Sequence, residues 1–196
     1  MKDIGQMLKD IEVQGWSYQQ NFFEHSFITK LIEQCKLRNM HQAAIGKNDT
    51  KQIKEGIRSD KISWLTNEET NSDILKYQGE ILNLKNALNE YFYLGLNDFE
   101  GHFAIYPEGS FYKKHIDRFK NDNRRTVTFI TYLNENWKPE DGGQLKLYLN
   151  DETLLIEPHA GSVICFLSDK IEHEVIIANK ERMSLTGWFL SGHTLI

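Results

Sequence analysis

The amino-acid sequence predicts a mainly β protein: an antiparallel barrel or double sheet with helical support on one outer face. Two observations predict this class. After about Phe99, short runs rich in β-branched and aromatic residues alternate with turn segments. Before that point, apolar residues recur at helical spacing. The 196 residues, 40% of them hydrophobic, suffice for one substantial core. We therefore expect one domain over residues 1–196, with helical support in 1–98 and the β core in 99–196.

The first half of the chain contains two helical patterns. In residues 25–36, HSFITKLIEQCK, apolar side chains fall three or four positions apart and mark one face of a helix. Residues 72–92 repeat this pattern, with Ser72 as the expected N-cap and Asp73 in the first turn. The intervening residues 46–61 are rich in charge and poor in large apolar groups, which is typical of a mobile loop.

The second half of the chain contains eight runs that we predict to be strands. They are HFAIY, SFYKKHID, RTVTFITYL, QLKLYL, TLLIE, SVICFL, HEVIIA and MSLTGWFL. Turn segments such as PEGS, KPEDGG and PHAG separate them. No internal repeat, low-complexity tract or linker stands out, so the sequence gives no support for a domain boundary.

Composition and charge exclude several classes of protein. A net charge of −5 and a pI near 5.8 provide no excess of cations to neutralise phosphates, so we expect no nucleic-acid partner. Cys35 and Cys165 lie far apart in apolar runs and are expected to be reduced core residues. The first residues lack the apolar core of a secretory signal, and no later run approaches the ~20 apolar residues of a membrane span. We therefore expect a cytoplasmic protein with no membrane partner.

Three residues have the types and spacing of a metal site. His115 and Asp117 lie in a predicted strand, where side chains two positions apart project from the same face. A His-x-Asp pair is common by chance, and two polar residues at a strand edge are the alternative. His173, in another short strand, favours the metal site, because two histidines and one carboxylate leave three positions open on iron(II). The absence of cysteine from this set argues against a structural zinc site.

Arg182 is the candidate partner of an anionic ligand. In RMSLTGWF, one strand face carries Arg182, Ser184, Thr186 and Trp188, and the other carries Met183, Leu185 and Phe189. If the first face lines the barrel, the guanidinium is buried. Burial of this charge is costly unless an anion pairs with it, and the planar guanidinium matches the geometry of a carboxylate. A salt bridge to a protein carboxylate is the alternative. Tyr132, on one face of RTVTFITYL with Thr128 and Ile130, would be a second donor to the same carboxylate, or an ordinary core tyrosine.

Several stretches together resemble the 2-oxoglutarate and iron(II) dependent dioxygenases, in the prolyl hydroxylase branch that includes the hypoxia-inducible-factor prolyl hydroxylases and their bacterial relatives. The resemblance covers roughly residues 42–190 and rests on GIRSDKISWL, FAIYPEGSFYKKHID, RRTVTFITYLNENWKPEDGGQLKLY, the span around DKIEHEV, and RMSLTGWFL. It implies a single oxygenase domain with a double-stranded β-helix, which is a jelly roll, backed by the N-terminal helices.

The resemblance also implies roles for individual residues. It implies a catalytic iron(II) held by His115, Asp117 and His173, and a 2-oxoglutarate whose distal carboxylate is bound by Arg182 and Tyr132. Tyr106 is placed near the chelating end of 2-oxoglutarate, and the pocket wall is formed by Ile130, Leu145, Val175, Thr186 and Trp188. Arg125 is placed near the substrate entrance, Arg58 and Asp60 form a pair in a flanking segment, and residues 47–57 match a mobile segment that folds over a peptide substrate.

The implied reaction is hydroxylation of a prolyl residue in a protein, with oxygen and 2-oxoglutarate as co-substrates and ascorbate as the reductant. The bacterial relatives suggest elongation factor Tu as the target. Two alternatives stay open: an oxygenase acting on another residue type or a small molecule, and a non-catalytic sensor of oxygen, iron or 2-oxoglutarate. A nucleic-acid demethylase ranks below both, given the acidic balance.

The sequence departs from the family in two regions that touch substrate. The turn between Tyr106 and His115 is one residue shorter than in the animal enzymes, and FKNDN replaces their loop after Asp117. These departures leave the identity of the target open. The remaining histidines, His102 among them, have no spacing that requires a ligand role, and we expect them at the surface or in packing.

Overall fold

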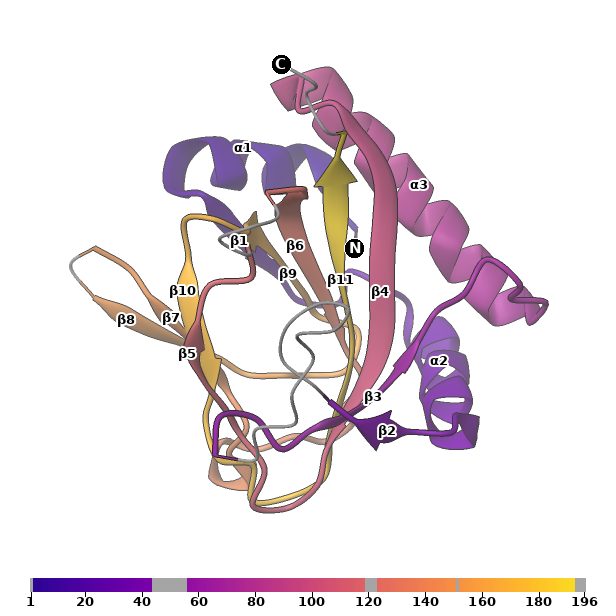
Figure 1. The fold of residues 1–196 in the computed structure, drawn as a ribbon, viewed down its shortest axis with the longest axis vertical. Coiled ribbons are helices and arrows are strands. Elements are labelled where there is room, and N and C mark those ends of the chain that lie inside the picture. The colour runs from indigo at the N-terminus through magenta and orange to yellow at the C-terminus, as the bar shows by residue number, and fades with distance from the viewer. Residues whose placement is uncertain (1, 44–55, 119–122, 151, 193–196) are drawn as a thin grey trace.

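A computed structural model describes residues 2–43, 56–118, 123–150 and 152–192. Two antiparallel sheets make up most of this structure, and helices lie against the outer side of the larger one (Figure 1). The prediction of a jelly-roll β fold with helical support is confirmed. No helix in the described ranges is long and apolar enough to span a membrane.

The larger sheet contains seven of the described strands. Their order is β1 (Trp16–Gln19), β9 (Val163–Leu167), β6 (Arg125–Tyr132), β11 (Arg182–Ser191), β4 (Leu96–Tyr106), β3 (Lys61–Trp64) and β2 (His41–Gln42). Every one of the pairings is antiparallel. Strand β11 lies at the centre, where it pairs with β4 on one side and β6 on the other.

The smaller sheet has four described strands in the order β5 (Tyr112–His115), β10 (Glu172–Val175), β7 (Leu145–Tyr148) and β8 (Thr153–Ile156). A short 3₁₀ helix, η2 (Pro139–Asp141), precedes β7. All eight predicted strand runs are therefore present. The predicted strand around SFYKKHID is shorter than expected, because β5 ends at His115 and Asp117 lies just beyond it.

Three described helices, α1 (Ile4–Gln14), α2 (His25–Leu37) and α3 (Ser72–Phe92), contribute the buried residues on one side of the larger sheet. The two predicted helices are confirmed as α2 and α3. The predicted cap of α3 was wrong. Asn71 is the N-cap, and its side-chain oxygen accepts hydrogen bonds from the backbone N–H groups of Asp73 (2.9 Å) and Ile74 (3.1 Å). Ser72 is the first residue of the helix.

Alternation along the central strands separates two hydrophobic clusters. On β11, Met183, Leu185 and Phe189 pack in the cluster that includes the helices. On the opposite face, Tyr132 and Ile130 of β6 belong to a second cluster, which also includes residues from the smaller sheet. Because side chains alternate between faces, one strand supplies both the helix-side core and the space between the sheets. Cys35 and Cys165 are buried and free in the helix-side cluster, as predicted.

Candidate active site

The metal site predicted from three residues is assembled in the space between the sheets. His115 ends β5 and pairs in register with His173 on β10, and Asp117 follows β5. One ligand atom from each residue lies within 4.8 Å of the other two. The Nε2 atoms of His115 and His173 each lie 3.5 Å from an oxygen of Asp117. Among the described residues, no other group of three or more His, Cys, Asp or Glu side chains is placed to hold a metal ion. The two surface polar residues of the alternative interpretation are therefore excluded.

Hydrogen bonds fix the orientation of all three side chains. The Nδ1 atom of His115 lies 2.7 Å from the carbonyl oxygen of Lys113, and that of His173 lies 3.0 Å from the carbonyl oxygen of Ile171. Since a carbonyl only accepts, Nδ1 carries the proton in each ring and Nε2 keeps a lone pair for a metal. The Thr128 hydroxyl donates to Oδ2 of Asp117 at 2.8 Å. The three residues therefore fit a divalent ion.

The charge states also suit a metal ion. Burial by itself would raise the pKa of Asp117, but the neighbouring His173 and His115 lower that pKa well below its usual range. The carboxylate is therefore ionised at neutral pH. Burial lowers the pKa of His173 to about 4, so this imidazole is neutral, which is the form that binds metals.

Arg182 lies on the inner face of β11, and its side chain is fully buried at 1% exposure. Its Nε donates to the carbonyl oxygen of Gly143 at 2.8 Å. No carboxylate of the described residues forms an ion pair with Arg182, so the predicted alternative of a protein salt bridge has no support there. A buried guanidinium without an anion is costly, and the arrangement fits an anionic ligand.

Two tyrosines border the guanidinium of Arg182. Its central carbon lies 4.9 Å from the ring centre of Tyr106 and 5.3 Å from that of Tyr132. Burial raises the pKa of each phenol, so both keep their protons at neutral pH. The Tyr132 hydroxyl is buried and has no hydrogen-bond partner among the described residues. A donor without a partner beside a cation fits a ligand carboxylate that accepts from both.

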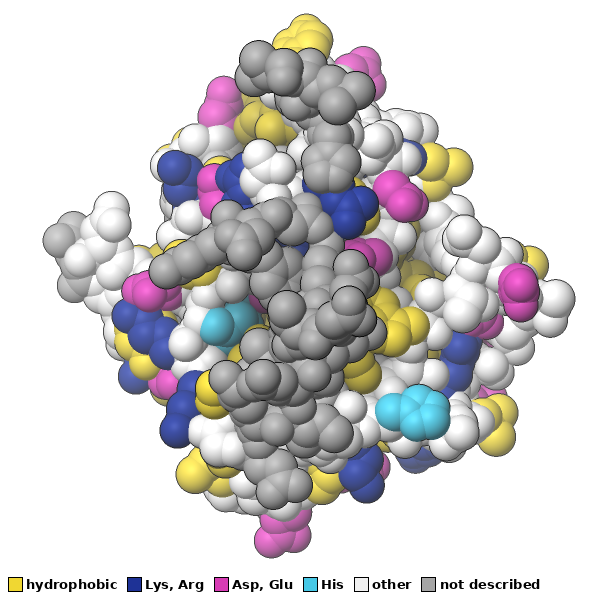
Figure 2. Space-filling view, in the orientation of Figure 1, with side chains coloured by type: hydrophobic (Ala, Val, Ile, Leu, Met, Phe, Trp, Pro, Cys, Tyr) yellow, Lys and Arg dark blue, Asp and Glu magenta, His cyan; other side chains and the backbone are white. Residues whose placement is uncertain are grey.

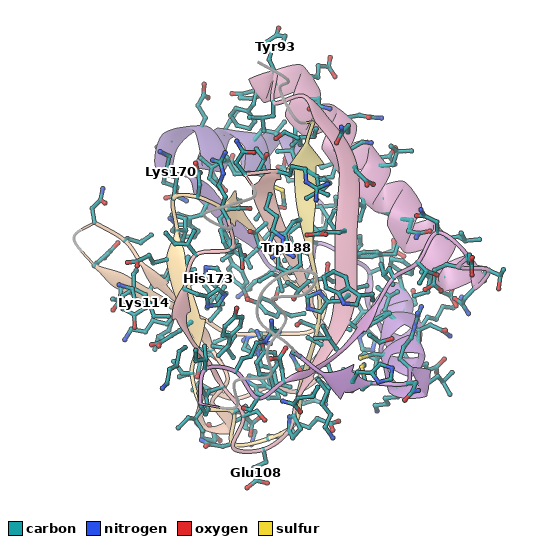
Figure 3. The ribbon with its side chains drawn as sticks, in the orientation of Figure 1. Tyr93, Glu108, Lys114, Lys170, His173 and Trp188 are labelled. Carbon is teal, nitrogen blue, oxygen red and sulfur yellow. The ribbon has the colours of Figure 1, made fainter. Side chains whose placement is uncertain are left out.

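The other residues expected at the co-substrate pocket also lie between the sheets. Ile130, Leu145 and Val175 belong to the inner hydrophobic cluster. Thr186 pairs in register with Ile130, and its hydroxyl lies 3.2 Å from that of Ser184. Figure 3 shows His173 on β10 and Trp188 on β11, in the part of the molecule between the two sheets.

The residues expected near the substrate are held by ion pairs. Arg58 makes a two-pronged contact with Asp60, with Nε to Oδ1 at 2.7 Å and Nη2 to Oδ2 at 2.5 Å. Arg125 donates from Nε to Glu100 at 2.6 Å. Residues 47–55 of the expected substrate segment lie outside the described residues. On the described face, positive and negative side chains are interspersed (Figure 2).

Sequence reasoning missed three residues at this site. Thr128 was placed on the same face as Tyr132 but was given no role, although it holds Asp117. Tyr112 stacks on the ring of His115 at a centroid distance of 3.6 Å and an interplanar angle of 15°. His102 is buried at 3% exposure and packs against Trp188. Alternation along the strand predicts the inward face of Thr128, but the positions of Tyr112 and His102 depend on pairings between strands.

Comparisons with known proteins agree with this geometry. Residues 101–190 match the family described as the 2OG-Fe(II) oxygenase superfamily. A crystal structure of a Pseudomonas putida prolyl-4-hydroxylase is 38% identical, with a TM-score of 0.89 over 97% of this chain and 100% of that chain. A prolyl hydroxylase in complex with a hypoxia inducible factor peptide fragment from Trichoplax adhaerens is 27% identical, with a TM-score of 0.86 over 96% of this chain and 89% of that one.

Curated relatives show the same likeness at lower coverage. The hypoxia-inducible factor prolyl hydroxylase of Caenorhabditis elegans is 29% identical over 94% of this chain. The human Egl nine homolog 1 is 30% identical over 68% of this chain. The chain spans only 28% and 33% of the lengths of these two relatives.

Proposed function

The chain belongs to the 2-oxoglutarate and Fe(II) dependent oxygenases, in their prolyl hydroxylase branch, and from this we propose that it hydroxylates a prolyl residue of a protein substrate. One observation supports this proposal most directly. The metal triad and a buried arginine without a carboxylate partner among the described residues border the same inner cluster, since Phe166 of that cluster contacts His173, and Tyr106 and Tyr132 contact Arg182. Together they provide for a divalent metal and for a carboxylate-bearing co-substrate.

Each group in this proposal has a defined task. His115, Asp117 and His173 hold iron(II), and Arg182 with Tyr132 holds the distal carboxylate of 2-oxoglutarate. When bound, the iron supplies the redox chemistry by which dioxygen oxidises 2-oxoglutarate to succinate and carbon dioxide and hydroxylates a substrate C–H bond.

The protein itself contributes position and exclusion of water. Thr128 and two backbone carbonyls keep the three ligand side chains in fixed orientations. The apolar residues Ile130, Leu145 and Val175 surround the co-substrate site and keep it dry. Proximity of the target carbon to the metal then favours reaction at one position.

The proposal extends to a first candidate substrate and a reductant. Elongation factor Tu is suggested by the bacterial relatives, and the support here is the likeness to a bacterial prolyl-4-hydroxylase over 97% of the chain. This substrate would place the reaction in the cytoplasm. Ascorbate is proposed as the reductant that keeps the iron in the iron(II) state.

The test is direct. The protein is incubated with iron(II), 2-oxoglutarate, ascorbate and either elongation factor Tu or a library of short peptides with a central proline. Mass spectrometry is expected to show a gain of one oxygen atom on proline, with an equal amount of succinate. Asp117→Ala is the control and is expected to release no succinate above background.

Two results would contradict the proposal, and each would favour another function. Hydroxylation confined to another residue type or to a small molecule would favour an oxygenase with a different substrate. Metal and 2-oxoglutarate binding without succinate release in the presence of any substrate would favour the sensor.

A further inference from the structure

Two consecutive glycines form the turn that precedes β7, and both have a backbone conformation that other residues rarely adopt. The φ angles of Gly142 and Gly143 are +68° and +64°. With a ψ of −151°, Gly142 lies in a region that is open essentially to glycine alone. Two such residues in succession indicate that the surroundings of this turn leave no room for a side chain.

The segment between β10 and β11 holds the turn on one side, and Trp137 holds it on the other. The N–H of Gly143 donates to the carbonyl oxygen of Ile177 at 3.0 Å. A Cβ atom on Gly142 would clash with that same oxygen. The Trp137 indole donates to the carbonyl oxygen of Gly142 at 3.0 Å. The peptide unit that joins the two glycines is therefore fixed from both sides.

Gly143 is in direct contact with the buried guanidinium side chain. Its carbonyl oxygen accepts a hydrogen bond from Nε of Arg182 at 2.8 Å. A Cβ atom on Gly143 would lie 2.9 Å from Cδ of Arg182 and 3.4 Å from Cζ2 of Trp137. The first distance is shorter than the contact that two non-bonded carbon atoms prefer. Only a residue without a side chain can bring its carbonyl oxygen to Nε at this position.

This contact decides which edge of the guanidinium is left for a ligand. Arginine has five N–H groups in a planar fork, and Nε of Arg182 is bonded to Gly143. A carboxylate must therefore meet the two terminal nitrogens, which the rings of Tyr106 and Tyr132 border. The backbone of Arg182 lies in the central strand β11, and its Nε is held by the turn. The terminal nitrogens thus lie at a fixed depth between the sheets.

We propose that Gly143 determines the chain length of the 2-oxo acid co-substrate, because it fixes the position of the Arg182 guanidinium relative to the metal triad. This inference rests on the proposed function, in which the metal binds one end of 2-oxoglutarate and Arg182 binds the other. A five-carbon diacid then spans the two groups. The four-carbon homologue is too short by one methylene, and the six-carbon homologue is too long by one.

The binding of three 2-oxo acids to manganese(II)-loaded protein without oxygen tests this inference. The parent protein is expected to bind 2-oxoglutarate about 10- to 200-fold more tightly than oxaloacetate or 2-oxoadipate, the usual discrimination for one methylene. Gly143→Ala is expected to displace Arg182 and to weaken the binding of 2-oxoglutarate most, since the other two acids already fit poorly. The ratio of affinities should therefore fall about tenfold or more.

Gly95 provides a matched control for backbone strain. Its φ angle is also +64°, and an added Cβ atom would meet no described atom within 4 Å. Figure 3 shows Tyr93, two residues before Gly95, at the opposite end of the molecule from Glu108. Gly95→Ala is expected to lower stability and to leave the ratio of affinities unchanged. An equal fall in the ratio for both alanine variants would make strain the cause and overturn the proposal.

Trp137→Phe provides a second test if Gly143→Ala does not fold. This variant keeps an aromatic ring beside the turn and removes the hydrogen bond to the Gly142 carbonyl oxygen. The peptide unit before Gly143 then loses one of its two restraints. We expect 2-oxoglutarate to bind about five- to tenfold more weakly, with smaller losses for the other two acids, so the ratio should fall here as well.

The outcomes separate this inference from the proposed function. If the parent protein binds none of the three acids, the proposed co-substrate is wrong and the inference falls with it. If the parent protein binds all three equally, or if folded Gly143→Ala, or Trp137→Phe in its place, keeps the parent ratio, the role of Gly143 is wrong while the proposed function stands. A lower ratio in that variant, with the parent ratio in Gly95→Ala, would establish the role.

Discussion

The buried guanidinium of Arg182 has a neutral carbonyl and two phenols around it, and its role can be tested by the binding of one ligand. We expect Arg182→Met to weaken 2-oxoglutarate binding by about 2–5 kcal/mol, because a desolvated charge pair loses one partner. Tyr132→Phe should weaken 2-oxoglutarate binding by about 1 kcal/mol, the typical contribution of one hydrogen bond. Titration calorimetry on metal-loaded protein without oxygen measures both. Equal affinity in parent and Arg182→Met would contradict the assignment.

Variants of Thr128 test how a hydrogen bond to a metal ligand affects the affinity for the metal. Thr128→Val removes the 2.8 Å hydrogen bond to Asp117, and we expect metal affinity to fall about 10- to 100-fold. Thr128→Ser should restore it. The control is Thr131→Val. Thr131 is also buried, but its hydroxyl contacts Tyr77 of α3 on the helix side, so its loss should lower stability and leave metal affinity unchanged. Competition with a metal-binding dye measures the affinity.

The buried imidazole of His102 makes stability depend on pH. Its folded pKa of about 3 lies below the ordinary value of 6.5, so the unfolded chain binds the proton more readily. Stability should therefore fall as pH drops from about 6.5 towards 3, by up to about 1.4 kcal/mol per pH unit from this group. In metal-free protein, urea unfolding of the parent and His102→Asn should diverge in this window. Parallel pH profiles would show that the ring does not titrate as described.

At the level of single elements, the cap of α3 gives a matched pair of variants. Asn71→Ala is expected to lower the free energy of unfolding by about 1 kcal/mol, since two backbone N–H groups lose their acceptor. Ser72→Ala, one residue further on, should have little effect, because Ser72 is already within the helix. Denaturant unfolding of both variants checks this. A larger effect of Ser72→Ala would show that the sequence-based assignment of the cap was right.

The elements that were predicted correctly have a strong periodic pattern. The eight strand runs of the second half combine β-branched residues with alternation, and α2 and α3 repeat apolar residues at helical spacing. Strands β1, β2 and β3 were not predicted. Their short sequences WSYQ, HQ and KISW have no clear alternation, and they are strands because a partner strand lies beside them.

One helix was missed although the sequence contained its signal. In α1, the buried residues Met7, Leu8 and Ile11 recur at helical spacing, and the side chain of Asp3 caps the first turn by accepting from Gln6 N–H at 2.8 Å. Residues 4–14 were nevertheless not predicted to be a helix. The position of Asp117 beyond the end of a strand could not be predicted, because nothing in the local sequence indicates that β5 ends at His115.

At the scale of the whole molecule, ligands should stabilise the fold because their binding residues come from both sheets. Iron(II) and 2-oxoglutarate at about 100 times their dissociation constants are each expected to add about 2.7 kcal/mol to the free energy of unfolding. Arg182→Met should lose the contribution of 2-oxoglutarate and keep that of the metal. Thermal unfolding with manganese(II) in place of iron avoids oxidation during the scan. No stabilisation by metal would contradict the site.

The sequence predicted which residues form the candidate site, but it did not predict which side chains pack around them. The types and strand positions of His115, His173 and Arg182 indicated a metal and an anion, and the resemblance supplied their roles. The contacts of His102 and Tyr112 arise from pairing between strands that are distant in the sequence, which one sequence does not reveal.

The central position of β11 bears on how the chain is made. This strand is the last described strand in chain order, yet it joins β4 to β6 and carries Arg182 and Trp188. During translation, the ribosome must have delivered residues up to Ser191 before the two halves of the larger sheet can be linked. A chain that ends between His173 and Arg182 would contain all three metal-binding side chains but would have no anchor for the co-substrate. Such a fragment is therefore expected not to bind 2-oxoglutarate.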